Sequence, residues 1–267
     1  MNGLLLRLAG PLQSWGERAA FGYRDTAAHP TRSALIGMLA AAQGRPRDQA
    51  LAPYQNLPGT PSHHDLTFTI RIDQPGTLYR DYHTVGGGRP ARQGLRTAAG
   101  GYRTADKSTL VTHRDYLTGA CFTVAVQGPA ALLGLIADTL EHPVWAPYLG
   151  RKACPPDEPL LLRADVPDPV HALLSQVPLT LPRPPAPGAS TVAVPLVWEQ
   201  RPDHHPHHQP DLELSCEPAD LTRHHRQHLP RPLWRTTEHL PAALYAGPQP
   251  IEALTRYILG EDACPPR

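Results

Sequence analysis

The stretch LTFTIRID at residues 66–73 decides the fold class, because its apolar and polar side chains alternate. One face of the expected strand carries Leu66, Phe68, Ile70 and Ile72. The threonines and Arg71 between them point to the other face, since successive side chains of a strand alternate. A strand of a parallel sheet is buried on both faces and reads as a continuous apolar run. The alternation therefore predicts a half-buried strand of an antiparallel sheet.

Upstream of this strand, the sequence predicts another strand and a helix. The alternation in LLLRLA at residues 4–9 predicts a strand that ends at Gly10-Pro11. A helix opens at Pro30-Thr31 and closes at Gly44. Its apolar stripe consists of Leu35, Ile36, Leu39 and Ala42.

Downstream, strand character extends over residues 77–85 and, in two pieces, over residues 110–127. Between them lies GGGRPARQGLRTAAGGYR, residues 86–103, which has no apolar periodicity and includes Arg89, Arg92, Arg96 and Arg103. We interpret it as the tip of a long mobile hairpin. A second amphipathic helix follows Pro129 and stops before Pro143.

This order of elements predicts an α+β fold, a ferredoxin-like β-α-β-β-α-β domain over residues 1–160 with a hairpin insertion at about 77–116. After Cys154 the composition changes: 22 of the 33 prolines lie in residues 155–267. Prolines at that density argue against long helices and central strands. We expect a small Pro/His-rich, β-containing region over residues 161–267, with short strands at 192–198 and 211–216 and a weak helix at 250–259.

The charge is divided unequally along the chain. Residues 1–152 carry 16 Lys+Arg against 10 Asp+Glu, a net charge of +6, whereas residues 153–267 carry 9 against 14, a net charge of −5. The first part should therefore attract polyanions. All but two of the 25 basic residues are arginines, whose planar guanidinium groups suit phosphate contact and base stacking.

Several classes of protein are disfavoured. Cys121, Cys154, Cys216 and Cys264 are far apart and form no CxxC, so neither a zinc knuckle nor a disulfide framework is expected. The apolar run at the N-terminus is too short for a signal peptide, and no run has membrane-spanning length. We expect a cytoplasmic protein that does not contact a membrane.

The most basic stretch runs from Arg80 to Arg114, with seven Lys+Arg, two acids and interleaved aromatic rings. Arginine pairs with phosphate and aromatic rings stack on unpaired bases, so this composition favours single-stranded RNA binding. A solvated flexible loop is the alternative. The histidine clusters at residues 201–211 and 223–229 lack a nearby cysteine and a fixed spacing, so we expect no physiological metal site and no cofactor.

An acid–base ribonuclease remains an alternative to a non-catalytic RNA-binding protein. Histidines stand near arginines at three places, which are His29 with Arg32, His83 with Arg80 and His113 with Arg114. The sequence has no G-x-x-x-x-G-K-[ST] loop, no G-x-S-x-G elbow and no paired-carboxylate metal signature, so nucleotide hydrolysis and metal-dependent nuclease chemistry are disfavoured. A third possibility is a protein-interaction module whose basic hairpin meets an acidic partner.

Four segments together resemble a known family. They are LRLAGPLQSWG at 6–16, PTRSALIGMLAAAQG at 30–44, RDYHTV at 80–85 with THRDYLTGACFTVAV at 112–126, and PYLGRKACP at 147–155. In this order they resemble the CasD family of type I-E Cascade subunits, within the RAMP superfamily of RNA-binding proteins. The resemblance covers roughly the first 160 residues, and the sequence beyond Leu162 departs from it.

The resemblance implies an RRM-like ferredoxin fold whose hairpin is a thumb, with a smaller C-terminal β region. It implies a non-catalytic subunit that caps the Cascade backbone and binds the 5′ handle, the repeat-derived 5′ end of the CRISPR RNA (crRNA). The implied partners are the crRNA, the backbone subunit and the large PAM-recognising subunit, with target DNA met only through the complex. Some related subunits process precursor crRNA, so a metal-independent endoribonuclease stays open as the alternative.

The resemblance also implies RNA-binding residues in the body of the protein. Gln13, Ser14 and Trp15 lie in the loop after the first strand, where a ring and an amide would contact a base; the alternative is that Trp15 is core. Thr31, Arg32 and Ser33 begin the first helix, whose amides suit a phosphate; the alternative is capping alone.

A turn after the second helix and the thumb supply the other candidates. The turn consists of Tyr148, Leu149, Gly150, Arg151 and Lys152, with Gly150 permitting close approach of the backbone and the two cations pairing with the handle. The thumb candidates are Arg80, Tyr82, His83, Arg103, Lys107 and Arg114, some of which would face the adjoining subunit instead. No catalytic residue is expected.

Overall fold

The computed structural model describes residues 2–17, 19–20, 22–87, 93–97, 99–104, 107–222 and 225–261. The larger sheet has seven strands, β1 (Gly3–Ala9), β5 (Thr67–Gln74), β8 (Cys121–Gln127), β9 (Leu161–Val166), β10 (Thr191–Trp198), β11 (Leu212–Asp220) and β12 (Gln227–Pro241). The smaller sheet contains β2 (Leu12–Gln13), β3 (Ala19–Ala20), β4 (Tyr23–Arg24), β6 (Thr77–Gly86) and β7 (Thr109–Thr118). The helices are α1 (Arg32–Ala42), α2 (Ala130–Glu141), α3 (Pro169–Ser175) and α4 (Pro250–Leu259). Short 3-10 turns include η1 (Arg47–Gln49), η2 (His63–Asp65) and η5 (Ala242–Leu244).

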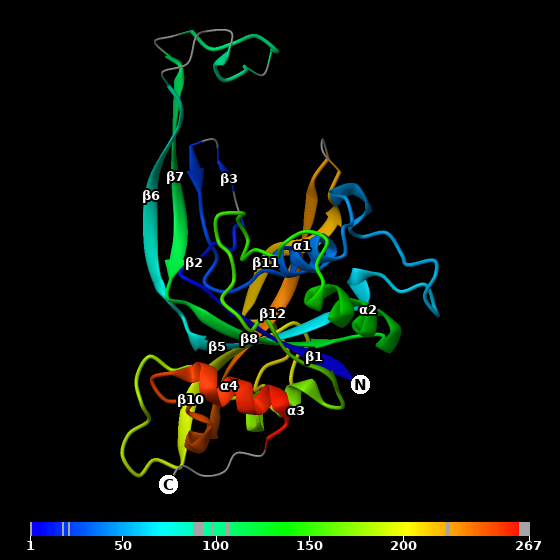
Figure 1. Cartoon of the computed structure of the whole chain (residues 1–267), viewed down its shortest axis with the longest axis vertical. Coiled ribbons are helices and arrows are strands. Elements are labelled where there is room, and N and C mark those ends of the chain that lie inside the picture. The colour runs from blue at the N-terminus through cyan, green and yellow to red at the C-terminus, as the bar shows by residue number, and fades with distance from the viewer. Residues whose placement is uncertain are drawn as a thin grey trace.

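The strands of the larger sheet lie in the order β11-β12-β10-β5-β8-β1-β9, and each pair of neighbours is antiparallel. Helices α1 and α2 lie over one face of this sheet and α3 and α4 over the other, while the β6–β7 hairpin projects away from the body (Figure 1). The predicted α+β class and antiparallel sheet are confirmed. Helices α1, α2 and α4 and strands β1, β5, β6, β7 and β8 also fall within one or two residues of their predicted bounds, whereas α3 was not predicted.

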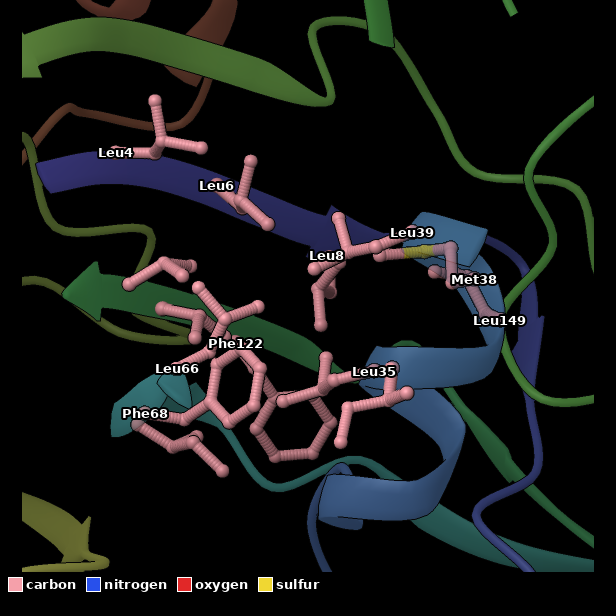
Figure 2. Close-up of a cluster of buried hydrophobic side chains, with 14 of the residues drawn as sticks. Leu4, Leu6, Leu8, Leu35, Met38, Leu39, Leu66, Phe68, Phe122 and Leu149 are labelled. Carbon is pink, nitrogen blue, oxygen red and sulfur yellow. The ribbon is translucent and has the colours of Figure 1, made fainter. Parts of the chain in front are cut away.

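The core is divided between the two faces of the sheet by the alternation within β1. Leu4, Leu6 and Leu8 belong to the cluster beneath α1 and α2, whereas Leu5 belongs to the cluster beneath α3. Figure 2 shows the first cluster, in which leucines of β1 and α1 gather around aromatic rings from β5 and β8. Side chains of this size typically contribute about 1.5–3 kcal/mol each on burial. β1 thus contributes to both halves of the core, as do β8 and β10.

The prediction that β5 is half-buried is wrong, because its polar face is buried as well. Arg71 on that face is fully buried, with Nε 2.6 Å from Asp73 Oδ1. Its guanidinium also donates to the backbone carbonyls of Leu173, Val177 and Pro178. α3 and the turn after it therefore cover this face of the sheet, and one arginine satisfies the carbonyls that they bury there.

The prediction that prolines keep the C-terminal strands out of the sheet interior is also wrong, since β12 lies between β11 and β10. The reason lies in where the prolines fall. Pro230 and Pro232 pair with β11 in the first part of β12, whereas β10 pairs only with residues 234–241. Pro195 of β10 likewise precedes the residues that pair with β5. Each of these prolines is paired with a strand on one side only, so its missing N–H does not remove a hydrogen bond to a second strand.

The β6–β7 hairpin pairs from Thr77–Thr118 at its base to Gly86–Thr109 toward its tip. Several of its large side chains are exposed to solvent, namely Leu78, Tyr79, Tyr82 and Val111. The expectation of an arginine-rich mobile tip falls partly on Arg89 and Arg92, which lie outside the described residues. The described part is a paired ribbon with an exposed aromatic and apolar surface.

Candidate nucleic-acid interface

A groove of about 1130 Å³ lies between α1, the segment that follows α2, and the end of the β11–β12 hairpin. Among the described residues that line it, six are basic and two are acidic. The basic residues are Arg24, Arg45, Arg47, Arg151, Lys152 and Arg226. The acidic residues are Glu17 and Asp25. A hollow lined by an excess of one sign of charge concentrates ligands of the opposite sign, so the groove favours a polyanion.

The turn at residues 148–152 is fixed to the loop after β1, and all its residues but Leu149 line one side of this groove. The expected contact between Leu149 and RNA is wrong, because its side chain is buried in the core. The Ser14 N–H donates to Leu149 O at 3.1 Å, and the Leu149 N–H donates to Cys154 O at 2.7 Å. Gly150 has φ +83°, and a Cβ there would lie 1.8 Å from Ser14 O. Only glycine fits this position, both in its conformation and in the space available. Two segments more than 130 residues apart in the sequence are thereby brought into contact at the groove.

Arg151 is held in position by several contacts. Its guanidinium lies 4.6 Å from the centre of the Tyr116 ring, and Nη2 donates to the carbonyls of Arg24 at 3.1 Å and Asp25 at 3.3 Å. Its Nη1 has no hydrogen-bond partner among the described residues. Lys152 beside it is exposed. The turn therefore presents one ordered cation and one free to reorient.

The expected contact between RNA and the side chains of Gln13, Ser14 and Trp15 is wrong, because all three are buried. Trp15 packs edge-on against Phe122, and its Nε1 donates to Gln13 Oε1 at 3.2 Å. Gln13 in turn donates to the backbone carbonyls of Leu8 and Ala120. The alternative, that Trp15 is a core residue, is what the structure shows. These side chains support the loop against which the turn at 148–152 rests.

The expectation that Arg32 adds charge to a phosphate site at the start of α1 is also wrong. Arg32 is buried and pairs with Glu199 at 2.8 Å and Glu217 at 2.6 Å, both from the C-terminal region. Thr31 is buried at the N-cap and makes no side-chain capping hydrogen bond. Ser33 lines the groove and is the one residue of this group that a ligand there could reach.

The thumb candidates lie along the β6–β7 hairpin and its tip, and none of them lines the groove. Arg80 pairs with Asp115 at 2.8 Å, and this hydrogen bond holds the pKa of Asp115 below its usual range. His83 lies 3.2 Å from Asp81. The remaining candidates are Tyr82, exposed on β6, Arg114 on β7, and Arg103 and Lys107 near the tip. The hairpin is thus a second surface, separate from the groove.

Sequence reasoning missed the groove residues Arg24, Arg45, Arg47, Trp145 and Arg226. Two of them had a usable signal. Trp145 stands three residues before the turn at 148–152, which is itself predicted to bind RNA. Arg226 belongs to the histidine-rich cluster at 223–229, which was weighed only as a metal site. Neither signal says that a residue near position 226 lies beside a helix near position 40.

The loop that carries Arg45 and Arg47 is anchored by a buried histidine. His63 lies beneath it, with Nδ1 2.7 Å from Ala50 O and Nε2 3.3 Å from the Tyr54 hydroxyl. The Tyr54 ring in turn lies 4.1 Å from the Arg45 guanidinium. Burial lowers the pKa of His63 to about 4. The neutral imidazole is therefore the form that this loop is built around.

His63 predicts an acid-sensitive stability. Below its ordinary pKa of 6.5 the unfolded chain binds a proton that folded His63 binds only near pH 4, so its stabilisation is full above pH 6.5 and is lost as pH falls toward 4. The free energy of unfolding should be about 2 kcal/mol lower at pH 5 than at pH 7.5 from this residue alone. Urea unfolding at the two pH values measures it, with His63→Gln and the exposed His142→Gln for comparison. If the difference in unfolding free energy between the two pH values remains in His63→Gln but changes in His142→Gln, the assignment to His63 is wrong.

The histidines weighed for catalysis do not gather at one place. His29 is buried, where burial lowers its pKa, and it contacts Pro30 O. His83 and His113 lie on neighbouring strands of the hairpin. Within the described ranges no three His, Cys, Asp or Glu side chains are grouped so as to hold a metal ion. No described helix combines the length and apolar character that crossing a membrane requires.

The fold and the groove define an α+β protein with a predominantly basic groove. The chain belongs to the CRISPR-associated Cas5 family, whose sequence model matches residues 3–238. The resemblance noted from four short segments is confirmed. The family match also extends well beyond residue 160, so the departure expected beyond Leu162 is one of local sequence and not of membership.

Individual relatives agree with this family. Over 188 residues the chain is 36% identical to the CRISPR system Cascade subunit CasD of Escherichia coli K12. The aligned residues make up 66% of this chain and 77% of that protein. It superposes with a TM-score of 0.83 on a chain of a CRISPR RNA-guided surveillance complex, at 42% identity over 96% of this chain and 99% of the other. A second solved structure, described as a Cas protein, gives a TM-score of 0.55 at 26% identity over 91% of this chain and 97% of the other.

Proposed function

We propose that this chain is the non-catalytic, CasD-type subunit of a type I-E Cascade complex and that it binds the 5′ handle of the crRNA. The observation that carries the proposal is the basic groove bordered by the fixed turn at residues 148–152. The 36% sequence identity between this chain and CasD of E. coli supports the same assignment, as does the superposition of the chain on a surveillance-complex chain. The partners are then the crRNA, the backbone subunit and the large PAM-recognising subunit, in the cytoplasm, where the complex surveys DNA in antiviral defence.

The topology supports a ferredoxin-like RAMP domain as the framework of this function. Strands β1, β5, β8 and β9 alternate with α1 and α2 along the chain in the order β-α-β-β-α-β and lie side by side as β5-β8-β1-β9. The β6–β7 hairpin is then the thumb, inserted between β5 and β8. Because β9 belongs to this domain, the domain ends a few residues beyond the proposed boundary at 160. Strands β10, β12 and β11 of the proposed C-terminal region over 161–267 extend the same sheet.

In the groove, the handle's phosphates contact Arg151 and Lys152. Arg151 is already oriented by Tyr116 and two carbonyls, so little conformational entropy is lost when it binds. Gly150 is exposed, and its missing side chain lets the turn pack against Ser14 O, so glycine here fixes the position of the two cations beside it. The thumb carries its exposed tyrosines and Arg80, Arg103, Lys107 and Arg114 toward the RNA and the adjoining backbone subunit.

Removing the two cations of the turn is expected to weaken handle binding. Arg151→Ala with Lys152→Ala loses two phosphate contacts, and because a hydrogen bond to a charged group contributes about 1.5–3 kcal/mol the affinity should fall at least tenfold. The slope of log K against log salt should become shallower by about 1.4 for two contacts on a single strand. Fluorescence anisotropy with labelled repeat RNA over a salt series measures both.

The matched control is Arg183→Ala with Arg256→Ala, which removes the same charge from exposed positions outside the groove. This variant should keep the wild-type affinity and salt slope to within about twofold, as expected for charges that touch no phosphate. Equal losses in the two double variants would show that total charge, and not the groove, determines binding.

Catalysis is not part of the proposal, and no described cluster of histidines favours the endoribonuclease alternative. Incubation of the full chain with precursor repeat RNA in EDTA tests it. The proposal expects the RNA to remain intact. Cleavage that persists in EDTA and disappears on substitution of one histidine would replace the non-catalytic function by RNA processing.

A further inference from the structure

Trp145 is an exposed indole at the edge of the basic groove. It is 49% exposed and lines the groove together with Val144, Ala146 and Pro147. The chain has four tryptophans, and the other three are packed: Trp15 and Trp198 are buried and Trp234 is half-buried. An exposed tryptophan in a fixed position calls for a partner, because it presents a large apolar ring to water.

The segment that carries Trp145 is fixed to α1. The Val144 N–H donates to Ala42 O at 2.8 Å, and the Val144 side chain covers Gly44, where a Cβ would lie 2.8 Å from Val144 Cγ1. Three residues beyond Trp145 the turn at 148–152 begins, which is hydrogen-bonded to Ser14. Figure 1 shows the segment after α2 passing beside α1. The backbone that carries the indole is therefore fixed on both sides of Trp145.

The groove beside Trp145 has room for a flat ring. The face of α1 that lines it consists mainly of small side chains, Ser33, Ala34, Gly37, Ala40 and Ala41, with the buried Met38 among them. A Cβ added at Gly37 would meet no heavy atom within 4 Å, so the space above this helix is open. The cations Arg45, Arg47 and Lys152 line the same groove. The groove thus combines an apolar ring, open space above α1 and positive charge around both. This combination suits an unpaired nucleotide, whose base stacks on the ring and whose phosphates pair with the cations.

We propose that Trp145 is a stacking platform for one unpaired base of the RNA bound in the groove. The inference rests on the proposed function and deepens it, because it names the residue that takes a base where Arg151 and Lys152 take phosphates. A protein partner would find an apolar patch here too, but the excess of basic side chains around the indole favours nucleic acid. Stacking is tolerant of sequence, since every base has a π-face.

Substitution of Trp145 is expected to weaken RNA binding without changing its salt dependence. Trp145→Ala should lower the affinity of the full chain for single-stranded repeat RNA at least about fivefold, whereas Trp145→Phe retains most of it. The salt slope should equal that of the wild type because the indole carries no charge. RNA should also quench tryptophan fluorescence in the wild type and not in Trp145→Phe, since the other three tryptophans are packed. The exposed Leu259→Ala on α4 controls for loss of apolar surface.

A series of RNAs that each lack one base identifies the stacked nucleotide. Removing the base at one position should lower the affinity of the wild type about as much as Trp145→Ala does. The same abasic RNA should bind the Trp145→Ala variant no more weakly than the intact RNA does. Equal effects of every abasic RNA on both proteins would overturn the proposal. If Trp145→Ala binds RNA normally while Arg151→Ala with Lys152→Ala does not, the stacking inference fails and the proposed function stands. If neither variant changes RNA binding, the proposed function fails as well.

A further outcome would also overturn the stacking proposal. In it, Trp145→Ala binds RNA normally but no longer assembles with the other subunits. It would assign the indole to a protein contact. Unfolding curves of both Trp145 variants should coincide with that of the wild type, because the indole is not part of either core cluster.

Discussion

Replacing Gly150 with alanine is expected to lower the free energy of unfolding by about 3 kcal/mol and to abolish tight RNA binding. The residue has φ +83°, a conformation that costs an L-residue about 1–2 kcal/mol. In addition, the new Cβ would lie 1.8 Å from Ser14 O, which is backbone and cannot turn aside. The turn must then separate from the loop after β1, and Arg151 loses the carbonyls of Arg24 and Asp25 that orient it.

Urea unfolding and RNA anisotropy on the same preparation test this prediction. The control is Gly134→Ala, in the middle of α2, where an added Cβ meets no heavy atom within 4 Å. That variant should be as stable as the wild type or more stable by up to about 1 kcal/mol, because alanine is the better helix former. A Gly150→Ala protein that unfolds at the wild-type urea concentration and binds RNA normally would show that the turn does not need glycine.

The predicted elements depended on information that lies within each segment. The alternation at residues 66–73 and the stop at Gly44 are set by neighbouring residues, and β5 and α1 begin and end close to the predicted positions. The order of these elements then limits the topology, because consecutive elements tend to lie next to one another. The class of fold follows from the sequence for this reason.

Site residues depended on contacts that the local pattern does not contain. Arg32 resembles a phosphate ligand at a helix start, but its carboxylate partners stand 167 and 185 residues further along the chain. Trp15 resembles a stacking ring in a loop, yet Phe122 and Gln13 enclose it. Gly150 is predicted as a position where RNA approaches the backbone closely, whereas the group that approaches it in the structure is Ser14 O. Residue types indicated a function here, and only the tertiary fold could assign it to particular residues.

Replacing Arg32 with methionine is expected to cost about 3–5 kcal/mol of folding free energy, the effect typical of breaking a buried ion pair from one side. Arg32 Nη1 lies 2.8 Å from both Glu199 Oε2 and Leu66 O, and Nη2 donates to His64 O at 2.9 Å. Without the guanidinium, Glu199 keeps Arg231 at 3.4 Å and the Phe68 N–H at 3.0 Å, and the carbonyls of Leu66 and His64 lose a donor. Methionine fills much of the space, so the loss reports on charge more than on volume.

The same experiment separates an internal role of Arg32 from a phosphate contact. Glu252→Ala breaks the exposed pair with Arg256 and should change stability by less than about 0.5 kcal/mol. Adding Glu199→Gln to Arg32→Met removes a buried charge that has lost its nearest cation and should restore part of the stability, because the neutral amide is less costly to bury. The folded Arg32→Met protein should retain the wild-type salt slope for RNA. A stable variant with a shallower slope would instead mean that Arg32 reaches the RNA and that β11 and β12 are joined to α1 by other contacts.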